Sequence, residues 1–115
     1  MLAKGGLAPW QLRRIVDHIE SNLTEPLSMT ELAGIAQLSR CYFTHAFKRS
    51  VGETPRAFII RQRVRRAQSL LLTTRTPLGQ IAFEAGFCDQ AHLTRMFGRL
   101  VGETPFIWRR RHEVW

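Results

Sequence analysis

The chain has few of the features that mark membrane or secreted proteins. No apolar run approaches the roughly 18 residues that a membrane-spanning helix needs. The N-terminus, MLAKGGLAPW, lacks the hydrophobic stretch of a secretory signal. Two cysteines, Cys41 and Cys88, are too few for a disulfide scaffold. These absences lead us to expect a soluble, cytoplasmic protein that neither spans nor binds a membrane.

The usual signals of catalysis are missing as well. The sequence offers no Ser-His-Asp set, no glycine-rich phosphate loop and no carboxylate pair at a useful spacing. We therefore expect no enzyme activity, no catalytic residues and no cofactor. Acidic residues are scarce, with 9 Asp and Glu against 17 Lys and Arg, which gives a net charge of +8. A surface this basic favours a polyanionic partner, nucleic acid first and an anionic membrane surface second.

Helix signals recur along the whole chain, and no segment shows the period-two alternation of a strand. Thr-Pro, with Thr as N-cap and Pro as the first helical residue, predicts a helix start three times. These pairs are Thr54-Pro55, Thr76-Pro77 and Thr104-Pro105. Further starts are expected at Pro9, at the capping-box pattern Ser28 to Glu31, at Ser39 and at Asp89. The prediction is an all-α protein of seven helices.

One segment of the chain occurs twice. Residues 43–55 and 93–105, fifty positions apart, are identical at eight of thirteen positions, including the pentapeptide VGETP. Upstream, residues 31–38 match 80–87 at a shift of forty-nine, and one extra residue near Cys88 accounts for the change. Each copy predicts a short helix, a tight turn and a longer helix, which is a helix-turn-helix. In VGETP, glycine ends one helix and Thr-Pro starts the next.

The repeat predicts an order of subdomains. Residues 1–8 form a tail or linker, 9–54 the first helix-turn-helix subdomain and 55–74 a long linker helix. Residues 75–112 form the second helix-turn-helix subdomain, and 113–115 a tail. A linker helix of eighteen residues would span roughly 27 Å. Successive major-groove segments on one side of B-DNA lie about 34 Å apart, so both units could reach the same face of a duplex.

The longer helix of each copy separates into two faces. Phe43, Phe47, Ser50 and Val51 are expected to point inward, as are Leu93, Phe97, Leu100 and Val101. The outward residues are expected to be Cys41, Thr44, His45 and Lys48, and Ala91, Thr94, Arg95 and Gly98, with Gln90 and His92 near the helix start. Arg can contact guanine, Gln can contact adenine, and Thr or Ala can pack on a thymine methyl. Gly98 is an unusual residue inside a helix, because it costs roughly 1 kcal/mol relative to Ala.

These outward faces predict a sequence-specific binder of double-stranded DNA that regulates transcription. Two recognition helices would lie in successive major-groove segments. The alternative is a basic helical module that binds RNA or anionic membrane surfaces. Steep salt dependence and a strong preference for one duplex sequence would favour the first function.

The segments LSRCYFTHAFKRSVGETP and IAFEAGFCDQAHLTRMFGRLVGETPFIWRR resemble the DNA-binding domain of AraC/XylS transcription regulators. The resemblance covers almost the whole chain, from about Pro9 to Arg111. It implies seven helices, with two helix-turn-helix units joined by a linker helix. It also implies base contacts by Arg40, Cys41, Thr44 and His45, and by Gln90, Ala91, His92, Thr94 and Arg95. Lys48 and Arg49 complete the set of expected DNA-binding residues.

The resemblance has consequences for partners. Members of this family usually carry a separate effector or dimerisation domain, mostly N-terminal to this one. MLAKGGLAP is typical of a linker, so we expect that domain to be missing from this chain. RNA polymerase is a further candidate partner.

Two groups of residues allow further interpretations. Cys41 with His45 and Cys88 with His92 make a possible zinc ligand set. The recognition helices that carry them are expected about 34 Å apart, which disfavours both a shared metal site and a disulfide. Trp10, Phe106 and Trp108 have helical spacings and are expected in the core.

Overall fold

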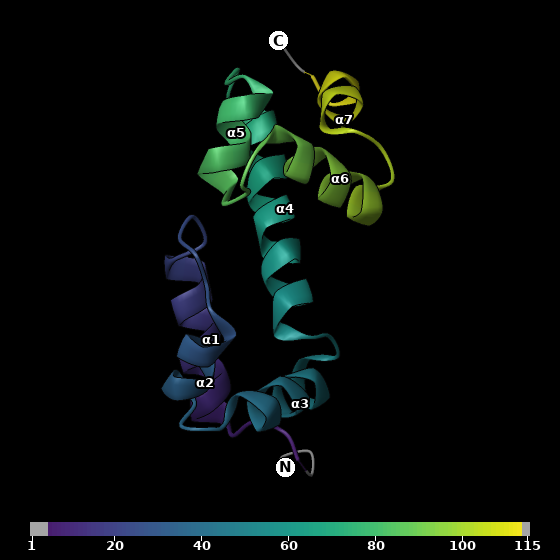
Figure 1. The fold of residues 1–115 in the computed structure, drawn as a ribbon. Coiled ribbons are helices and arrows are strands. Elements are labelled where there is room, and N and C mark those ends of the chain that lie inside the picture. Colours follow the sequence, from purple (N-terminus) through teal and green to yellow (C-terminus); the bar gives the residue numbers. More distant parts are fainter. Residues whose placement is uncertain (1–4, 114–115) are drawn as a thin grey trace. The chain divides into compact units, whose positions relative to one another are not determined.

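The computed structural model describes residues 5–113, which form seven helices and no strand (Figure 1). The all-α prediction is therefore confirmed. The helices are α1 (Pro9–Ser21), α2 (Met29–Ile35), α3 (Arg40–Val51), α4 (Pro55–Thr73), α5 (Leu78–Ala85), α6 (Gln90–Val101) and α7 (Pro105–Arg111). They divide into two compact units that meet between Ile59 and Ile60, inside α4. None of the helices described is long and apolar enough to cross a membrane.

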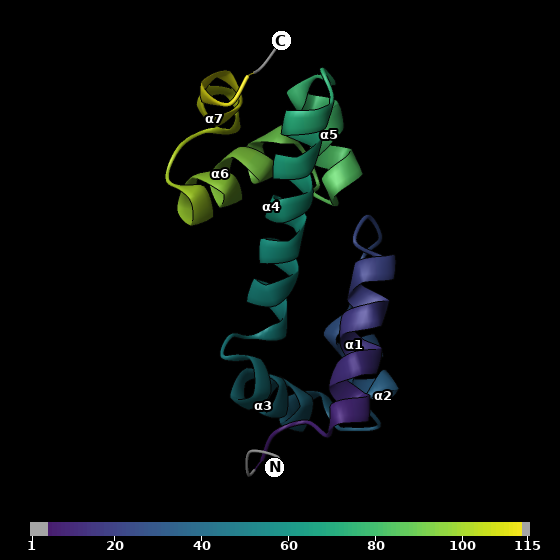
Figure 2. The same ribbon diagram turned by 180° about the vertical axis from the view of Figure 1, so that it is seen from behind.

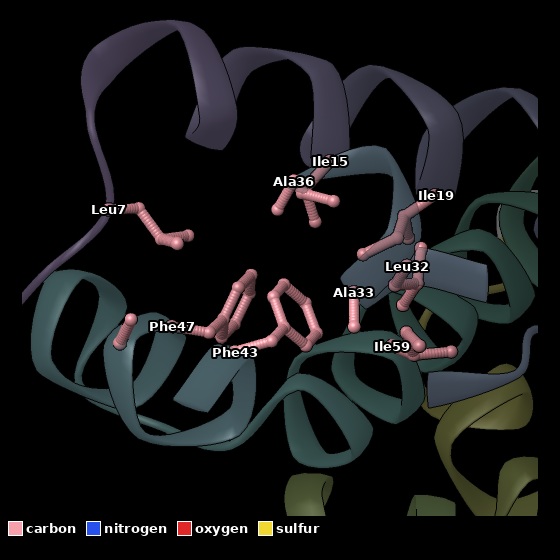
Figure 3. Close-up of a cluster of buried hydrophobic side chains, with 10 residues drawn as sticks. Leu7, Ile15, Ile19, Leu32, Ala33, Ala36, Phe43, Phe47 and Ile59 are labelled. Atoms are coloured by element: carbon pink, nitrogen blue, oxygen red, sulfur yellow. The ribbon is translucent and has the colours of Figure 1, made fainter. Parts of the chain in front are cut away.

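The first unit packs α1, α2 and α3 around an aromatic centre (Figure 3). Phe43 and Phe47 stand one turn apart on α3, and both are fully buried. Their ring centroids lie 5.9 Å apart, and Phe47 meets Phe58 edge-on at 5.5 Å. The remaining buried residues are aliphatic: Leu7, Ile15, Ile19, Leu32, Ala33, Ala36, Ala46 and Ile59. This core fixes which face of α3 remains outside.

The N-terminus of α2 is only half a capping box. Ser28 Oγ accepts a hydrogen bond from the Glu31 backbone N–H at 3.0 Å, as the pattern predicts. The Glu31 carboxylate, however, lies 2.7 Å from His18 Nε2 on α1. Gln11 makes a second tie between α1 and the end of α2, donating to the Ala36 carbonyl at 2.8 Å. These side chains hold α1 against the helix-turn-helix.

The two helix-turn-helix turns have the same backbone form. Gln37 follows α2 with φ of 59°, and Gly86 follows α5 with φ of 97°. The next amide donates five residues back in both cases, Leu38 to Ala33 at 2.9 Å and Phe87 to Ala82 at 2.8 Å. The residues that align at a shift of forty-nine therefore form the same turn in both copies.

The second unit surrounds the C-terminal half of α4 with α5, α6 and α7 (Figures 1 and 2). Phe97 of α6 is fully buried and meets Trp108 of α7 edge-on, with ring centroids 5.7 Å apart. The other buried residues are Val64, Ala67, Leu71, Ile81, Ala82, Ala85, Phe87 and Leu93. The core therefore combines the Phe97–Trp108 pair and Phe87 with small and branched aliphatic side chains.

The repeated pentapeptide makes the same corner in both units. Gly52 and Gly102 end α3 and α6 in the left-handed conformation, with φ of 94° and 95°. Thr54 Oγ1 then accepts from the Ala57 amide, and Thr104 Oγ1 accepts from the Ile107 amide, each at 3.2 Å. The corner prediction is confirmed at both places.

The third Thr-Pro pair behaves differently from the prediction. Helix α5 begins at Leu78, Pro77 is its N-cap and no side chain caps it. The Thr76 carbonyl accepts a hydrogen bond from Arg109 Nη1 at 2.8 Å, and the Thr76 amide donates to Thr74 Oγ1. These long-range and local contacts fix Thr76 as part of the preceding loop instead of as a cap.

Four expectations about burial are wrong. Trp10 and Phe106 are 44% and 58% exposed, and Leu100 is 40% exposed. Ser50 is exposed too, and its hydroxyl accepts a hydrogen bond from the Leu7 amide at 2.7 Å. Arg14 lies over the Trp10 ring at 5.7 Å and Arg110 over the Phe106 ring at 5.9 Å. A guanidinium can cover an aromatic face at the surface, so helical spacing alone did not place these rings in the core. Trp108 does pack against the core of the second unit, as expected.

Candidate nucleic-acid interface

Helix α3 presents four of the predicted residues around one hollow. Ser39 Oγ caps the helix by accepting from the Tyr42 amide at 3.3 Å. The buried Phe43 and Phe47 turn the opposite face outward. There an open hollow of about 470 Å³ is lined by Arg40, Cys41, Thr44 and His45. The first unit thus brings together all the residues to which base contacts were assigned on its recognition helix.

The chemistry of this hollow is mixed. Thr44 is half-buried and donates its hydroxyl proton to the Arg40 carbonyl at 3.1 Å. Its methyl group and the exposed Cys41 thiol give apolar surface of the kind that packs on a thymine methyl. Arg40 and His45 are exposed and add hydrogen-bonding groups. A base edge would meet both apolar and polar atoms here.

Lys48 and Arg49 lie outside the hollow. Lys48 is exposed two turns beyond Cys41 on the same face of α3. Arg49 extends along the N-terminal segment, where a Cβ at Gly5 would lie 3.3 Å from the arginine Cδ and Nε. The two cations therefore border the candidate interface at different places.

Helix α6 is oriented in the same way as α3 within its own unit. Asp89 Oδ1 caps it by accepting from the His92 amide at 2.8 Å, and Leu93 and Phe97 are fully buried. Ala91 and Arg95 are exposed and Thr94 is half-buried, so the predicted outward face is confirmed. Gln90 is exposed too, and its Oε1 would lie 3.5 Å from a Cβ at Gly79, on α5.

His92 stands apart from the other predicted residues of α6. Its ring meets Phe87 edge-on, with centroids 5.2 Å apart and planes at 87°. Its Nδ1 is buried without a hydrogen-bond partner. The ring thus packs on the turn between α5 and α6, and its contact with a base stays a prediction.

The arginines of α4 make different contacts within the second unit. Arg66 Nε donates to the Glu84 carbonyl of α5 at 2.6 Å, a structural contact. Burial lowers the pKa of the half-buried Arg63, and the neighbouring Cys88 acts in the opposite direction. Arg61 and Arg65 line a groove of about 290 Å³ beside Leu100 of α6.

Sequence reasoning missed the structural role of one arginine. Arg109 on α7 donates from all three guanidinium nitrogens to carbonyls: Leu71 at 3.2 Å, Thr74 at 2.8 Å and Thr76 at 2.8 Å. It fastens the end of α4 and the loop that leads into α5. Arg109 lies at the end of the segment that resembles the AraC/XylS domain, but its position in the sequence carries no signal for contacts more than thirty residues away.

Neither cysteine forms a disulfide. Cys41 and Cys88 are both free and exposed. Across residues 5–113, no group of three or more His, Cys, Asp or Glu side chains is placed to hold a metal ion. The candidate interface is therefore built from cations, amides, hydroxyls and small apolar groups.

Comparison with known proteins places this geometry in a family. A helix-turn-helix domain model matches residues 32–111. The regulator LumQ of Photobacterium leiognathi, described as a probable transcriptional regulator, is 34% identical over 91 residues, which cover 79% of this chain and 37% of LumQ. The transcriptional activator NphR of Rhodococcus is 30% identical, over 88% of this chain and 30% of NphR. The chain spans about a third of the length of these relatives.

Solved structures agree with the sequence relatives. The DNA-binding domain of the global transcriptional factor AdpA, solved with a target DNA, is 29% identical with a TM-score of 0.82, covering 89% of this chain and 91% of that one. An AraC-type regulator from Chromobacterium violaceum is 28% identical with the same TM-score, covering 90% and 93%. The chain therefore belongs to the AraC/XylS family of transcription regulators and contains the DNA-binding domain of that family.

Proposed function

We propose that α3 and α6 are two recognition helices that enter successive major-groove segments of one duplex and contact different base pairs. The observation that carries this proposal is the hollow of about 470 Å³ on α3, whose lining residues are the predicted base contacts. The corresponding face of α6 has Ala91 in place of Cys41 and Arg95 in place of His45. Two units with one scaffold and different outward residues suit an asymmetric DNA site.

Roles for single residues follow from their hydrogen-bonding capacity. Arg95 is the side chain suited to the O6 and N7 atoms of guanine, and Gln90 is suited to adenine. Thr44, Cys41, Thr94 and Ala91 supply apolar contacts to thymine methyl groups. Arg40, His45 and His92 add polar contacts to bases, while Lys48 and Arg49 neutralise phosphates, which position the protein without selecting sequence.

The wider setting of this activity also follows from the family. The chain spans about a third of the length of LumQ and NphR, so the proposed intact regulator carries a separate effector or dimerisation domain. Its proposed site of action is the cytoplasm. Contact with RNA polymerase would connect DNA binding to transcription.

Selection of bound duplexes from a random library tests the proposal. We expect an asymmetric site with two short elements about one helical turn apart, bound at least about 10³-fold more tightly than random duplex. Affinity should fall steeply with salt, because each neutralised phosphate contributes about 0.9 to the slope of log K against log salt. Equal affinity for random duplex, RNA and anionic vesicles would contradict the proposal.

Arg95→Ala separates base contact from general attraction in the same assay. The variant should tolerate any base at one or two positions where wild type selects guanine. Arg110→Ala, which removes an exposed cation stacked on Phe106 of α7, is the matched control and should keep the wild-type base preferences. If Arg95→Ala weakened binding to all sequences equally, the role of Arg95 would be in phosphate contact.

A further inference from the structure

Gly98 lies in the interior of α6, where nothing among the described residues requires a glycine. A Cβ built at this position would meet no atom within 4 Å outside its own stretch of helix. Its φ is not in the left-handed range, unlike that of Gly102, and its carbonyl accepts from the Gly102 amide at 3.0 Å. Glycine is among the least favourable residues inside a helix. The cost of Gly98 is therefore not offset by any contact within the described chain.

The other copy of the repeat shows that the fold accepts a long side chain here. Lys48 of α3 occupies the position that corresponds to Gly98 at the fifty-residue shift, and it is exposed. Both helices have the same buried phenylalanine one position earlier, Phe47 and Phe97. At this position α3 and α6 therefore differ in a side chain that faces away from the core.

The position of Gly98 on α6 indicates what would come close to it. It stands one turn beyond Thr94 and two turns beyond Ala91, on the outward face that also carries Arg95. It follows Gln90, the first residue of α6, by about 12 Å along the axis at about 1.5 Å per residue. The major groove is about 12 Å wide. When the start of a recognition helix contacts base edges, a residue this far along reaches the groove wall, which is a sugar-phosphate backbone.

We propose that Gly98 is a close-approach point at which the backbone of α6 lies directly against one DNA strand. The absent side chain lets α6 enter the groove more deeply than α3 does. The flanking Arg95 and Arg99, both exposed, are thereby brought closer to the DNA. This assignment rests on the proposed role of α6 as a recognition helix, and it makes Gly98 a determinant of affinity although it has no side chain.

Gly98→Ala separates stability from binding. The variant should melt at a Tm about 4 °C higher, because alanine is a better helix former and the site is open. Its Kd for the selected duplex should nevertheless rise about tenfold, because the added methyl group holds α6 away from the strand. Gly34→Ala is the matched control, a helical glycine of α2 whose Cβ would also meet nothing within 4 Å. It should raise the Tm similarly and leave the Kd unchanged.

Gly98→Lys installs the side chain found at the corresponding position of α3 and gives a second readout. We expect weaker binding of the selected duplex despite the added positive charge. Tighter binding, with a salt slope steeper by about 0.9, would show room for a side chain and overturn the assignment. Wild-type affinity of Gly98→Ala would overturn it too. Equal binding of selected and random duplexes by the wild-type protein would instead overturn the proposed function, and this assignment with it.

Discussion

At the scale of single residues, Arg109 shows how one side chain can fix a helix-turn-helix unit. A helix end leaves carbonyl groups without intrahelical partners, and a cation near that end is favourable. The rigid fork of the guanidinium reaches Leu71 in the last turn of α4 together with Thr74 and Thr76 in the loop. The start of α5 is therefore set by α7, at the far end of the unit in sequence.

Arg109→Lys tests this role. A lysine ammonium keeps the charge but lacks the planar fork, so it cannot bond all three carbonyls. We expect the free energy of unfolding to fall by about 2 kcal/mol, as partly buried carbonyls lose charged donors. Urea denaturation measures the change. Arg110→Lys, at an exposed neighbouring position, should stay within about 0.5 kcal/mol of wild type. Equal stabilities of the two variants would show that the three contacts contribute nothing.

At the scale of helices, the Thr-Pro pairs show where local sequence decides a boundary and where it does not. Thr54 and Thr104 follow a glycine that has already ended a helix, so the chain is free to start the next one. Thr76 instead follows the loop fastened by Arg109. Thr-Pro therefore starts a helix in two places, whereas at Thr76-Pro77 the helix begins one residue later, at Leu78.

Alanine substitutions distinguish a threonine that caps a helix from one that does not. Thr104→Ala should lower the free energy of unfolding by about 1 kcal/mol, because it removes the hydroxyl that accepts from the Ile107 amide. Thr76→Ala should cost less than about 0.5 kcal/mol, because its side chain caps no helix. Thermal denaturation of both variants provides the comparison. A large loss for Thr76→Ala would mean that α5 depends on that hydroxyl for its start.

Prediction from sequence worked where the determining contacts are local. The caps at Ser39, Asp89, Gly52 and Gly102 are predictable because each of these residues acts within four residues of itself. The burial of Phe43 and Phe97 followed from helical period. The exposure of Trp10 and Phe106 did not follow from helical period, because an arginine that stacks on an aromatic ring makes a favourable contact while the ring stays at the surface. The hollow on α3 and the Arg109 contacts depend on tertiary packing, which spacing does not encode.

At the scale of the whole molecule, the length of α4 sets the DNA spacing that we expect. Its 19 residues form one uninterrupted helix, about 28 Å long at 1.5 Å per residue. Inserting 5 bp between the two elements of the selected site would turn one of them to the opposite face of the duplex. We expect specific binding to be lost, and not regained with 10 bp, because α4 cannot lengthen. An electrophoretic mobility shift assay measures the affinity for three duplexes: the selected site and its variants with 5 bp and 10 bp inserted. Unchanged affinity after 5 bp would mean that only one helix selects sequence.

The sharing of α4 between the two cores has a consequence for folding kinetics. Ile59 belongs to the first core and Val64 to the second, little more than one helical turn further on. The first turn of a helix is the unfavourable step, and extension afterwards is easy. Whichever unit collapses first therefore leaves α4 nucleated, and the helix grows into the other unit without a second nucleus. A substitution that slows the collapse of one core should thus leave the other unit to collapse first, so that the slowed core still forms against a helix that is already nucleated.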